Sequence, residues 1–294
     1  MELLNVKSVD KSYGGVVANH DVSLTVPKGK IALKNVVAMA GSTIAEGTTP
    51  QPIIKNVSCI IEAGESLGMT GPSGSGKSTL ARLMLGIIKP ISGTIRVDGA
   101  ELTTEVQRQF SPYFGYLPQD VELFDGTVAE NIARFREGDP EQVIAAAQLS
   151  GAHEVILSLP EAYETRIGAS GANLSGGQRQ RIGLARAVYD HPSVVVLDEP
   201  TSNLDNEGRL ALIATMKKLK EMGSTVILIA HQPSLFSEMD KVAFVAEGQI
   251  QKFGPAKEVI QELNPRKTVI KDKSAANGRP LKVKPQITVK QVSN

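Results

Sequence analysis

The sequence has no tryptophan, one cysteine and only 4% aromatic residues in a chain of 294 residues. A single cysteine excludes an internal disulfide, and Cys59 lies in an apolar run that predicts a buried structural thiol. Neither charge is in excess, with Lys+Arg 32 against Asp+Glu 31, so nothing indicates nucleic acid as a partner. A secretory signal is absent, as is any run of about 18 apolar residues. We therefore expect that the chain does not cross a membrane by itself.

One glycine-rich loop dominates what the sequence does contain. It lies between a β-like segment, 66–70, and an amphipathic helical segment, 80–88, which is the context of a phosphate-binding loop. Inward-facing N–H groups and a helix N-terminus there attract anions. Lys77 is expected to bridge the β- and γ-phosphates of a nucleotide, and the Ser78 hydroxyl to ligate Mg²⁺. The alternative is a glycine turn that caps a helix by accident. The loop comprises Gly71, Pro72, Ser73, Gly74, Ser75, Gly76, Lys77, Ser78 and Thr79.

Apolar strand-like runs alternate with helical periodicity along the chain, which predicts an α/β fold with a mainly parallel sheet wrapped by helices. Strand-like segments before the loop predict an N-terminal antiparallel β subdomain, and 127–159 predicts a helical insertion whose first helix covers 128–135. We divide the chain into a degenerate β segment or linker (1–32), a nucleotide-binding domain (33–263, helical subdomain about 120–185) and a tail (264–294). The tail is basic, with Asp272 as its one acid, and we expect it to be disordered or loosely attached.

Two adjacent acids follow the most apolar strand-like run, Val194–Leu197. A strand buried on both faces reads as such a run, and its C-terminal edge is where open α/β sheets bind ligands. Asp198 is therefore expected to hold Mg²⁺ and Glu199 to polarise the attacking water. The alternative reading, a strand end with two solvated acids, is weak once the phosphate loop is considered.

A second candidate anion site lies at residues 174–181, Leu-Ser-Gly-Gly-Gln-Arg-Gln-Arg. Ser175, Gly176 and Gly177 come just before a predicted helix, so free N–H groups and the helix dipole again face an anion. The chain thus has two phosphate sites but one set of catalytic acids. A head-to-tail homodimer resolves this, with the second site completing the nucleotide pocket of the other subunit. An ordinary capped helix is the alternative.

In their order along the chain, these motifs resemble the nucleotide-binding domain of ABC transporters, over about residues 33–263. The resemblance implies a P-loop NTPase core with a signature motif within 174–181 on the helical insertion, and ATP and Mg²⁺ as ligands. It also implies roles for four further residues. Gln119 senses Mg²⁺ and the membrane domain, Ser175 contacts the γ-phosphate of the partner's ATP, His231 links γ-phosphate to the catalytic acid, and Asp205 of segment 202–205 belongs to the nucleotide site.

The stretch from Tyr116 to Ile132 resembles exporter cassettes, and with 151–153 and 159–160 it is most similar to ATPases of type I protein secretion. Such cassettes carry a glutamate before the signature, where this chain has Ala169. They also carry an aromatic ring for adenine, where this chain has Met39-Ala40-Gly41. Tyr13, within a segment similar to the adenine-stacking one, is the alternative ring. The membrane domain that normally precedes the cassette is missing, so we expect it in trans or lost from this chain.

We therefore predict an ATP-hydrolysing subunit at the cytoplasmic face of the inner (plasma) membrane, peripheral to it, that powers export, with protein as the expected cargo. An ATPase of another exporter or an importer is the nearest alternative. A truncated cassette that is not coupled to transport is a further alternative, whereas a non-hydrolysing interaction module is disfavoured by intact Lys77, Asp198, Glu199 and His231. DNA-repair ATPases of this fold need a long coiled coil between Gln119 and the signature, which is absent. Translation-factor ATPases have two cassettes.

Overall fold

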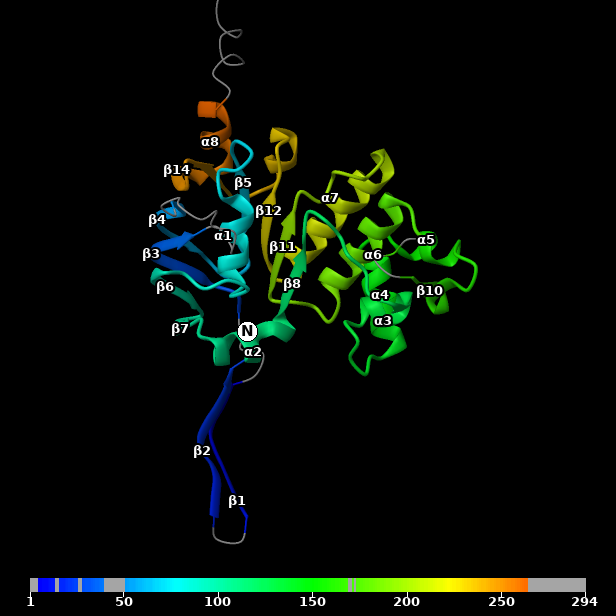
Figure 1. Cartoon of the computed structure of the whole chain (residues 1–294), viewed down its shortest axis with the longest axis horizontal. Helices are drawn as coiled ribbons and strands as arrows, with labels where there is room; N and C mark the ends of the chain where they lie inside the picture. Colours follow the sequence, from blue (N-terminus) through cyan, green and yellow to red (C-terminus); the bar gives the residue numbers. More distant parts are fainter. Residues whose placement is uncertain are drawn as a thin grey trace, which may run out of the picture.

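The computed structural model describes residues 5–13, 16–25, 28–39, 51–168, 171 and 173–263, with the backbone alone for residues 5–25 (Figure 1). The tail at 264–294, for which we predict disorder, and the segment 40–50 lie outside the described residues. Within the described ranges, no helix combines the length and the apolar character that crossing a membrane requires.

A six-stranded sheet forms the centre of the molecule. Every neighbouring pair is parallel except β13 with β14, which confirms the mainly parallel sheet. β11 and β12 are buried at every position, which explains their continuous apolar runs. The spatial order is β14 (Gln249–Pro255), β13 (Lys241–Ala246), β5 (Ser66–Thr70), β12 (Thr225–Ile229), β11 (Val194–Asp198) and β8 (Phe114–Leu117).

Alternate residues of the central strands enter two hydrophobic cores, one on each face of the sheet. Val194 and Val196 of β11 belong to the core that contains residues of α1 (Lys77–Met84). Val195 and Leu197 belong to the core that contains residues of α6 (Gly176–Val188) and α7 (Asn206–Glu221). Helices thus cover both faces, as Figure 1 shows, and α8 (Ala256–Leu263) contacts β13 and β14.

An antiparallel sheet packs on α1 and forms the predicted β subdomain. Its order is β4 (Pro52–Ile61), β3 (Ile31–Met39), β6 (Ser92–Val97) and β7 (Ala100–Glu101). Cys59 is buried within it, as expected, and burial raises the pKa of its thiol to about 12, so the thiol is unreactive. β1 (Asn5–Tyr13) and β2 (Val16–Thr25) pair with each other in a separate antiparallel sheet. The division after residue 32 stays a prediction, and β3 begins at Ile31.

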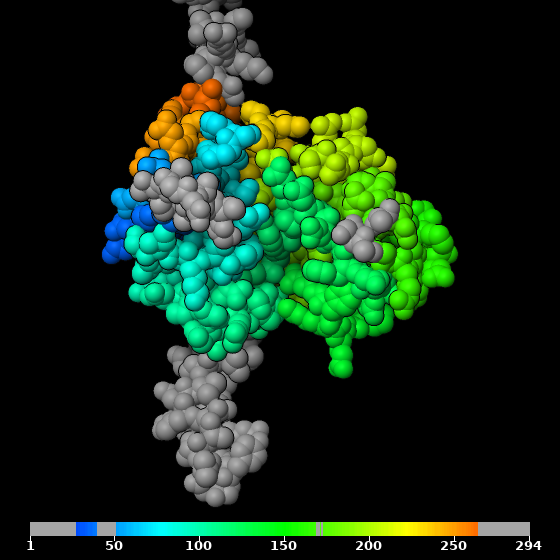
Figure 2. All heavy atoms as spheres, viewed as in Figure 1, coloured from blue at the N-terminus to red at the C-terminus, as the bar shows by residue number. Residues whose placement is uncertain are grey.

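Short helices fill the segment between β7 and α6. Capping side chains start three of them, with Thr103 before α2, a capping box at Thr127 before α3, and Asp139 followed by a proline before α4. In Figure 2 the green surface of this helical insertion stands beside the cyan surface around α1. The elements are α2 (Thr104–Phe110), β9 (Gly126–Thr127), α3 (Val128–Ile132), α4 (Pro140–Leu149), α5 (His153–Leu157) and β10 (Arg166–Ile167), and 3-10 turns occur at Ser111–Tyr113, Ala162–Glu164 and Pro233–Phe236.

Two predicted helix boundaries are wrong. Periodicity predicts a helix over 80–88, but α1 begins at Lys77 and ends at Met84 because Gly86 adopts a left-handed φ of 69°. Periodicity also predicts a helix over 128–135, but α3 ends at Ile132. Arg134 and Phe135 both take left-handed backbone conformations, with φ of 57° and 55°.

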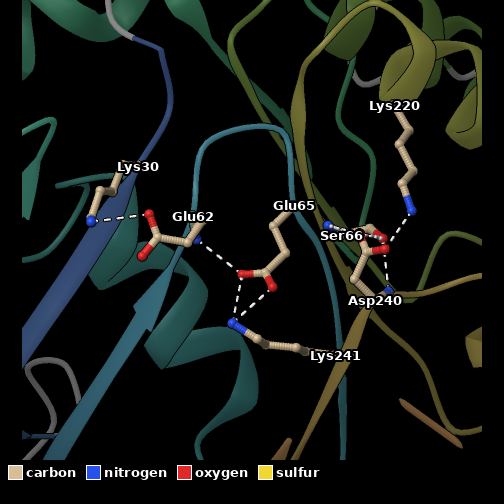
Figure 3. A network of polar contacts seen from close by, with 7 residues as sticks. All are labelled: Lys30, Glu62, Glu65, Ser66, Lys220, Asp240 and Lys241. Atoms are coloured by element: carbon tan, nitrogen blue, oxygen red, sulfur yellow. Dashed lines mark hydrogen bonds and ion pairs between the residues drawn. The ribbon is translucent and has the colours of Figure 1, made fainter. Parts of the chain in front are cut away.

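A network of polar contacts joins the N-terminal ends of β5 and β13 to the end of α7, at the edge opposite to the C-terminal ends of the parallel strands (Figure 3). The Asp240 carboxylate accepts hydrogen bonds from Ser66 N (2.8 Å) and Ser66 Oγ (2.7 Å), and it pairs with Lys220 Nζ at 2.6 Å. These contacts fix the start of β5, the strand that leads into the glycine-rich loop. The other members are Lys30, Glu62, Glu65 and Lys241.

Candidate functional site

Four parallel strands end in register, and the predicted site residues follow their ends. Leu117 of β8 is opposite Leu197 of β11, Asp198 is opposite Ile229 of β12, and Ile229 is opposite Met69 of β5. Because carboxyl ends of parallel strands share one edge, the segments that follow them meet there. The edge thus brings together, in spatial order, the loop 71–79, His231, Asp198 with Glu199, and Gln119 (Figure 1).

The glycine-rich loop wraps around the Lys77 side chain. Only 5% of Lys77 is exposed, and its Nζ donates hydrogen bonds to the carbonyl oxygens of Gly71 (3.0 Å) and Pro72 (2.9 Å). Gly71 has a φ of 145°, and a Cβ there would lie 1.9 Å from the carbonyl oxygen of Val245. Glycine is therefore required at that turn. Burial lowers the pKa of Lys77, opposed by the nearby charges of Glu199 and Asp198.

The remaining loop residues differ in their exposure. Pro72, Ser73 and Gly74 are exposed at the tip, and Ser78 and Thr79 are half-buried at the start of α1. Ser75 is buried, and its hydroxyl has no hydrogen-bond partner among the described atoms. The backbone N of Leu80 already donates to Gly76 O at 2.8 Å, so α1 begins immediately beneath the loop. The backbone N of Ser75 donates to Pro72 O at 3.3 Å, whereas the N–H groups of residues 76–79 make no hydrogen bond among the described residues and are available to an anion.

Asp198 is the most unusual group of the site. It is fully buried, and neither carboxylate oxygen has a hydrogen-bond partner among the described residues. Burial raises the pKa of this carboxyl, and the charge of Glu199 acts in the same direction, whereas the nearby Ser78 hydroxyl and the charges of Arg82 and Lys77 lower it. The Ser78 hydroxyl is close enough to affect the pKa but does not meet the distance and angle of a hydrogen bond to either oxygen. A buried carboxylate without partners is costly, so its position calls for a cation, an ordered water or both.

Glu199 and His231 contact each other across two adjacent strand ends. Glu199 Oε1 lies 2.9 Å from His231 Nε2, and the backbone N of Glu199 donates to Ile229 O at 3.0 Å. Glu199 holds a left-handed φ of 48°, an uncommon conformation for a non-glycine residue that the strand contact stabilises. Gln119, after the end of β8 at Leu117, is exposed.

The second predicted anion site occupies the start of α6. Ser175 is the exposed N-cap, and it forms a capping box in which its Oγ accepts from Gln178 N (3.2 Å) and its N donates to Gln178 Oε1 (2.8 Å). Gly176 and Gly177 lie beside Asn203. Among the described contacts, no hydrogen bond joins residues 175–177 to the loop 71–79 of the same chain, and β12 and β11 separate β5 from β8, on which α6 packs.

Two hydrogen bonds join α6 to the segment 199–205, which follows β11 and contains Glu199 and Asp205. Asp205 caps α7, where its Oδ1 accepts hydrogen bonds from Gly208 N (2.7 Å) and from Arg181 Nη2 (3.0 Å). The hydrogen bond from Gly208, and to a smaller extent Arg181, holds the pKa of Asp205 below its usual range. Sequence reasoning missed Gln180. Its side chain is buried, and Nε2 donates to the carbonyl oxygen of Pro200 at 3.1 Å. A glutamine at a core-facing position of a helix was the available signal.

A cleft of about 400 Å³ opens beside Gln119, between the end of β8 and the helical insertion. Two exposed aromatic rings line it, Phe124 (61% exposed) and Phe135 (50% exposed), packed edge to face with centroids 6.0 Å apart. Asn131 holds Phe124 in place, because its side chain accepts from Phe124 N at 2.8 Å and donates to Phe124 O at 2.9 Å.

Of the residues expected around adenine, Met39 ends β3 opposite Pro52, whereas Ala40 and Gly41 lie outside the described residues. Ala169, which replaces the glutamate before the signature, also lies outside them. Tyr13 ends β1, of which only the backbone is described.

Comparisons with known proteins agree on one family. The sequence profile described as "ABC transporter" matches residues 54–202. The chain is 46% identical over 216 residues to the type I secretion system ATP-binding protein PrsD of Rhizobium meliloti (strain 1021), covering 73% of this chain and 37% of PrsD. It is 38% identical over 244 residues to the leukotoxin translocation ATP-binding protein LktB of Mannheimia haemolytica, covering 83% of this chain and 34% of LktB.

A solved structure, that of a bacterial Atm1-family ABC exporter with ATP bound, resembles this chain with a TM-score of 0.73 and 31% identity. The similarity covers 81% of this chain and 41% of the exporter chain. The chain thus spans little more than a third of the two curated relatives and under half of the solved exporter.

Proposed function

Because this chain belongs to the ABC transporter family of ATP hydrolases, we propose that it binds ATP and Mg²⁺ on residues 71–79 and hydrolyses the ATP to power export through a membrane partner. One observation carries the proposal. The buried, unpartnered carboxylate of Asp198 lies at the same sheet edge as the loop that encloses Lys77. A cation and an anion bound together would satisfy both groups.

The donor set fits Mg²⁺. The described residues include no group of three or more His, Cys, Asp or Glu side chains arranged for a metal. Mg²⁺ in nucleotide sites needs none, since it takes one or two protein oxygens and completes its shell with phosphate and water. Ser78, Gln119 and Asp198 would hold it, and when bound it would neutralise phosphate charge.

The other residues of the site divide the remaining work. Lys77 is already held inside the loop and exchanges its two carbonyl contacts for phosphate oxygens, the role of a P-loop lysine. Glu199 orients and polarises the attacking water, and His231 keeps the Glu199 carboxylate in place through their 2.9 Å contact. Water attacks the γ-phosphorus, the bond to the bridging oxygen breaks, and ADP and phosphate leave.

Two copies complete each site. Ser175, Gly176 and Gly177 lack hydrogen bonds to the loop of their own chain among the described residues, yet they offer a helix N-terminus. In a head-to-tail homodimer they would contact the γ-phosphate held by the loop 71–79 of the other subunit, with Asp205 near the same interface. Bound ATP would then contact both subunits and stabilise the dimer, and its hydrolysis would allow the dimer to dissociate.

The membrane partner supplies the pathway. We place this membrane-spanning domain and the chain together at the cytoplasmic face of the inner (plasma) membrane. The cleft with exposed Phe124 and Phe135 supports such a partner, because paired exposed aromatics beside Gln119 are unusual on a free surface. Similarity to PrsD and LktB favours type I secretion, with protein as cargo.

The test is ATP hydrolysis by the purified chain at increasing protein concentration. The proposal expects Mg-dependent turnover whose specific rate rises with concentration and is abolished by Lys77→Ala. Turnover that is independent of Mg²⁺ would refute the site. A specific rate that stays constant over a hundredfold concentration range, in a protein that remains monomeric, would refute the shared sites. Co-purification from membranes with a membrane-spanning chain then tests the partner.

A further inference from the structure

The guanidinium of Arg134 binds backbone carbonyls on two different elements. Nε donates to Arg186 O (3.0 Å), Nη2 to Ala187 O (3.2 Å) and Tyr189 O (3.5 Å), and Nη1 to Phe114 O (3.0 Å). Three of these oxygens belong to the C-terminal end of α6, where carbonyls lack helical partners and the dipole is negative. The fourth begins β8. Arg134 therefore fastens the end of α6 to the central sheet.

Local structure is arranged to deliver this side chain. α3 ends at Ile132, and Arg134 and Phe135 take consecutive left-handed conformations, a strained arrangement that the contacts Arg134 N to Asn131 O (3.3 Å) and Phe135 N to Glu130 O (2.9 Å) maintain. Burial lowers the pKa of Arg134 to about 10, with Arg136 adding to the effect, so the group stays charged at neutral pH.

A second contact supports α6 nearer its start. The buried Gln180 side chain donates to the carbonyl oxygen of Pro200, directly after Glu199. Core packing holds the buried face of α6 along its length, through Ile182, Leu184, Ala185, Ala187 and Val188. The Gln180 and Arg134 hydrogen bonds add directional contacts to that packing, the first toward the N-terminal end of α6 and the second at its C-terminal end.

We infer that Arg134 is a positioning residue for Ser175, because it fixes the direction of α6 and thereby where the helix N-terminus meets the nucleotide of the partner subunit. This inference rests on the proposed head-to-tail dimer. At about 1.5 Å per residue, Ser175 lies about 7–8 Å from Gln180 along the axis and Ala187 about 10 Å on the other side. A shift of about 1 Å at Ala187 therefore moves Ser175 by roughly 0.7 Å. Misplacements of this size cost on the order of tenfold to a hundredfold in rate.

Three full-length variants test it. Arg134→Met removes every donor, Arg134→Lys restores charge and part of the hydrogen bonding, and Arg136→Met is the matched control because Arg136 is exposed and two positions away. We expect kcat to fall about tenfold in Arg134→Met, to recover partly in Arg134→Lys and to stay within twofold in the control. ATP affinity of the monomer should change by less than twofold. An unchanged kcat, or an equal loss of monomer affinity, overturns the inference.

Mixed dimers separate this inference from the proposed function. Arg134→Met mixed with Lys77→Ala should regain activity, since one site pairs an intact loop from the first subunit with a correctly held α6 from the second. The reference mixture, Ser175→Arg with Lys77→Ala, should regain activity for the same reason. Recovery in the reference alone overturns the role of Arg134. Failure of the reference mixture counts against the shared site itself, and with it against the proposed dimer.

Hydrogen exchange in the monomer measures the support of α6 without requiring the dimer. In monomeric Arg134→Met, amides at 176–180 and 186–189 should exchange several-fold faster than in the parent, while those of β11 should be unchanged. Unchanged exchange throughout α6 overturns the inference. Equally faster exchange in β11 means global destabilisation and also overturns it.

Discussion

Substitution of Glu199 by glutamine separates hydrolysis from folding and binding. Glutamine has the same shape as glutamate and its side-chain oxygen still accepts from His231 Nε2, the 2.9 Å contact of the parent. Glutamine and glutamate should adopt the left-handed φ of 48° at this position at a similar energetic cost. What it lacks is the negative charge that orients and polarises a water.

The kinetic and thermodynamic effects should therefore differ widely. Loss of a group that takes part in proton transfer lowers kcat by about 10²–10⁴, which is about 2.7–5.4 kcal/mol in the barrier. The Glu199–His231 pair is 24% and 45% exposed at its two side chains, so its charge contributes only about 0–1 kcal/mol to stability. ATP affinity should be unchanged, because the loop 71–79 and not Glu199 would hold the phosphates.

Single-turnover hydrolysis, thermal unfolding and light scattering with saturating Mg-ATP together measure these effects. Glu247→Gln is the matched control, since Glu247 is exposed and also has a left-handed φ, of 54°. The Glu199→Gln protein should accumulate as an ATP-bound dimer, and the control should behave as the parent. Turnover within tenfold of the parent would refute the role of Glu199, and a protein that stays monomeric would refute the shared site.

Three further predictions concern other parts of the chain. Ser175→Arg should leave monomer ATP affinity intact but abolish turnover and its dependence on protein concentration; weakened monomer binding would place Ser175 in its own site. Asp240→Asn should destabilise the fold by about 1–2 kcal/mol, because the partly exposed carboxylate loses its charged contacts with Ser66 and Lys220. Burial raises the pKa of Asp240, but Lys220 and Ser66 outweigh it and lower the pKa. This stabilisation is therefore complete above the unfolded-state pKa of about 3.9 and is lost as pH falls through the folded-state pKa. In urea titrations, the free energies of unfolding of the parent and Asp240→Asn should differ at pH 7 and converge at pH 3. ATP should bind only modestly better than GTP, and Tyr13→Ala should leave ATP affinity unchanged; a large loss of ATP affinity in that variant would make Tyr13 the stacking ring.

The central sheet was predictable because its signals are local. A strand segment buried on both faces is apolar, and Val194–Leu197 and Val226–Ile229 meet that condition. The loop 71–79 was also predictable, because only glycine can occupy Gly71 beside the Val245 carbonyl. Placement of Asp198, Glu199 and His231 at one edge follows from the direction of parallel strands.

Features that depend on distant backbone could not be predicted. The end of α3 at Ile132 comes from two left-handed residues, Arg134 and Phe135, whose conformation no propensity favours. These conformations place the Arg134 side chain against backbone carbonyls at the end of α6. Because every residue has a backbone carbonyl, the sequence does not reveal which ones Arg134 will contact. Gln180 and Pro200 illustrate the same limit, since the acceptor is again a main-chain oxygen.

The same contacts bear on how two sites in one dimer would communicate. Pro200 directly follows Glu199, and its carbonyl holds Gln180 of α6, while Arg181 of α6 pairs with Asp205 at the start of α7. In the proposed head-to-tail arrangement, Glu199 acts on the nucleotide of its own subunit and Ser175 on that of the other. A movement of Glu199 on hydrolysis would thus pass through Pro200 to α6 and displace Ser175 at the opposite nucleotide. Because Arg134 holds the far end of that helix, the displacement becomes a rotation about a fixed point, and a rotation moves the helix N-terminus in one defined direction.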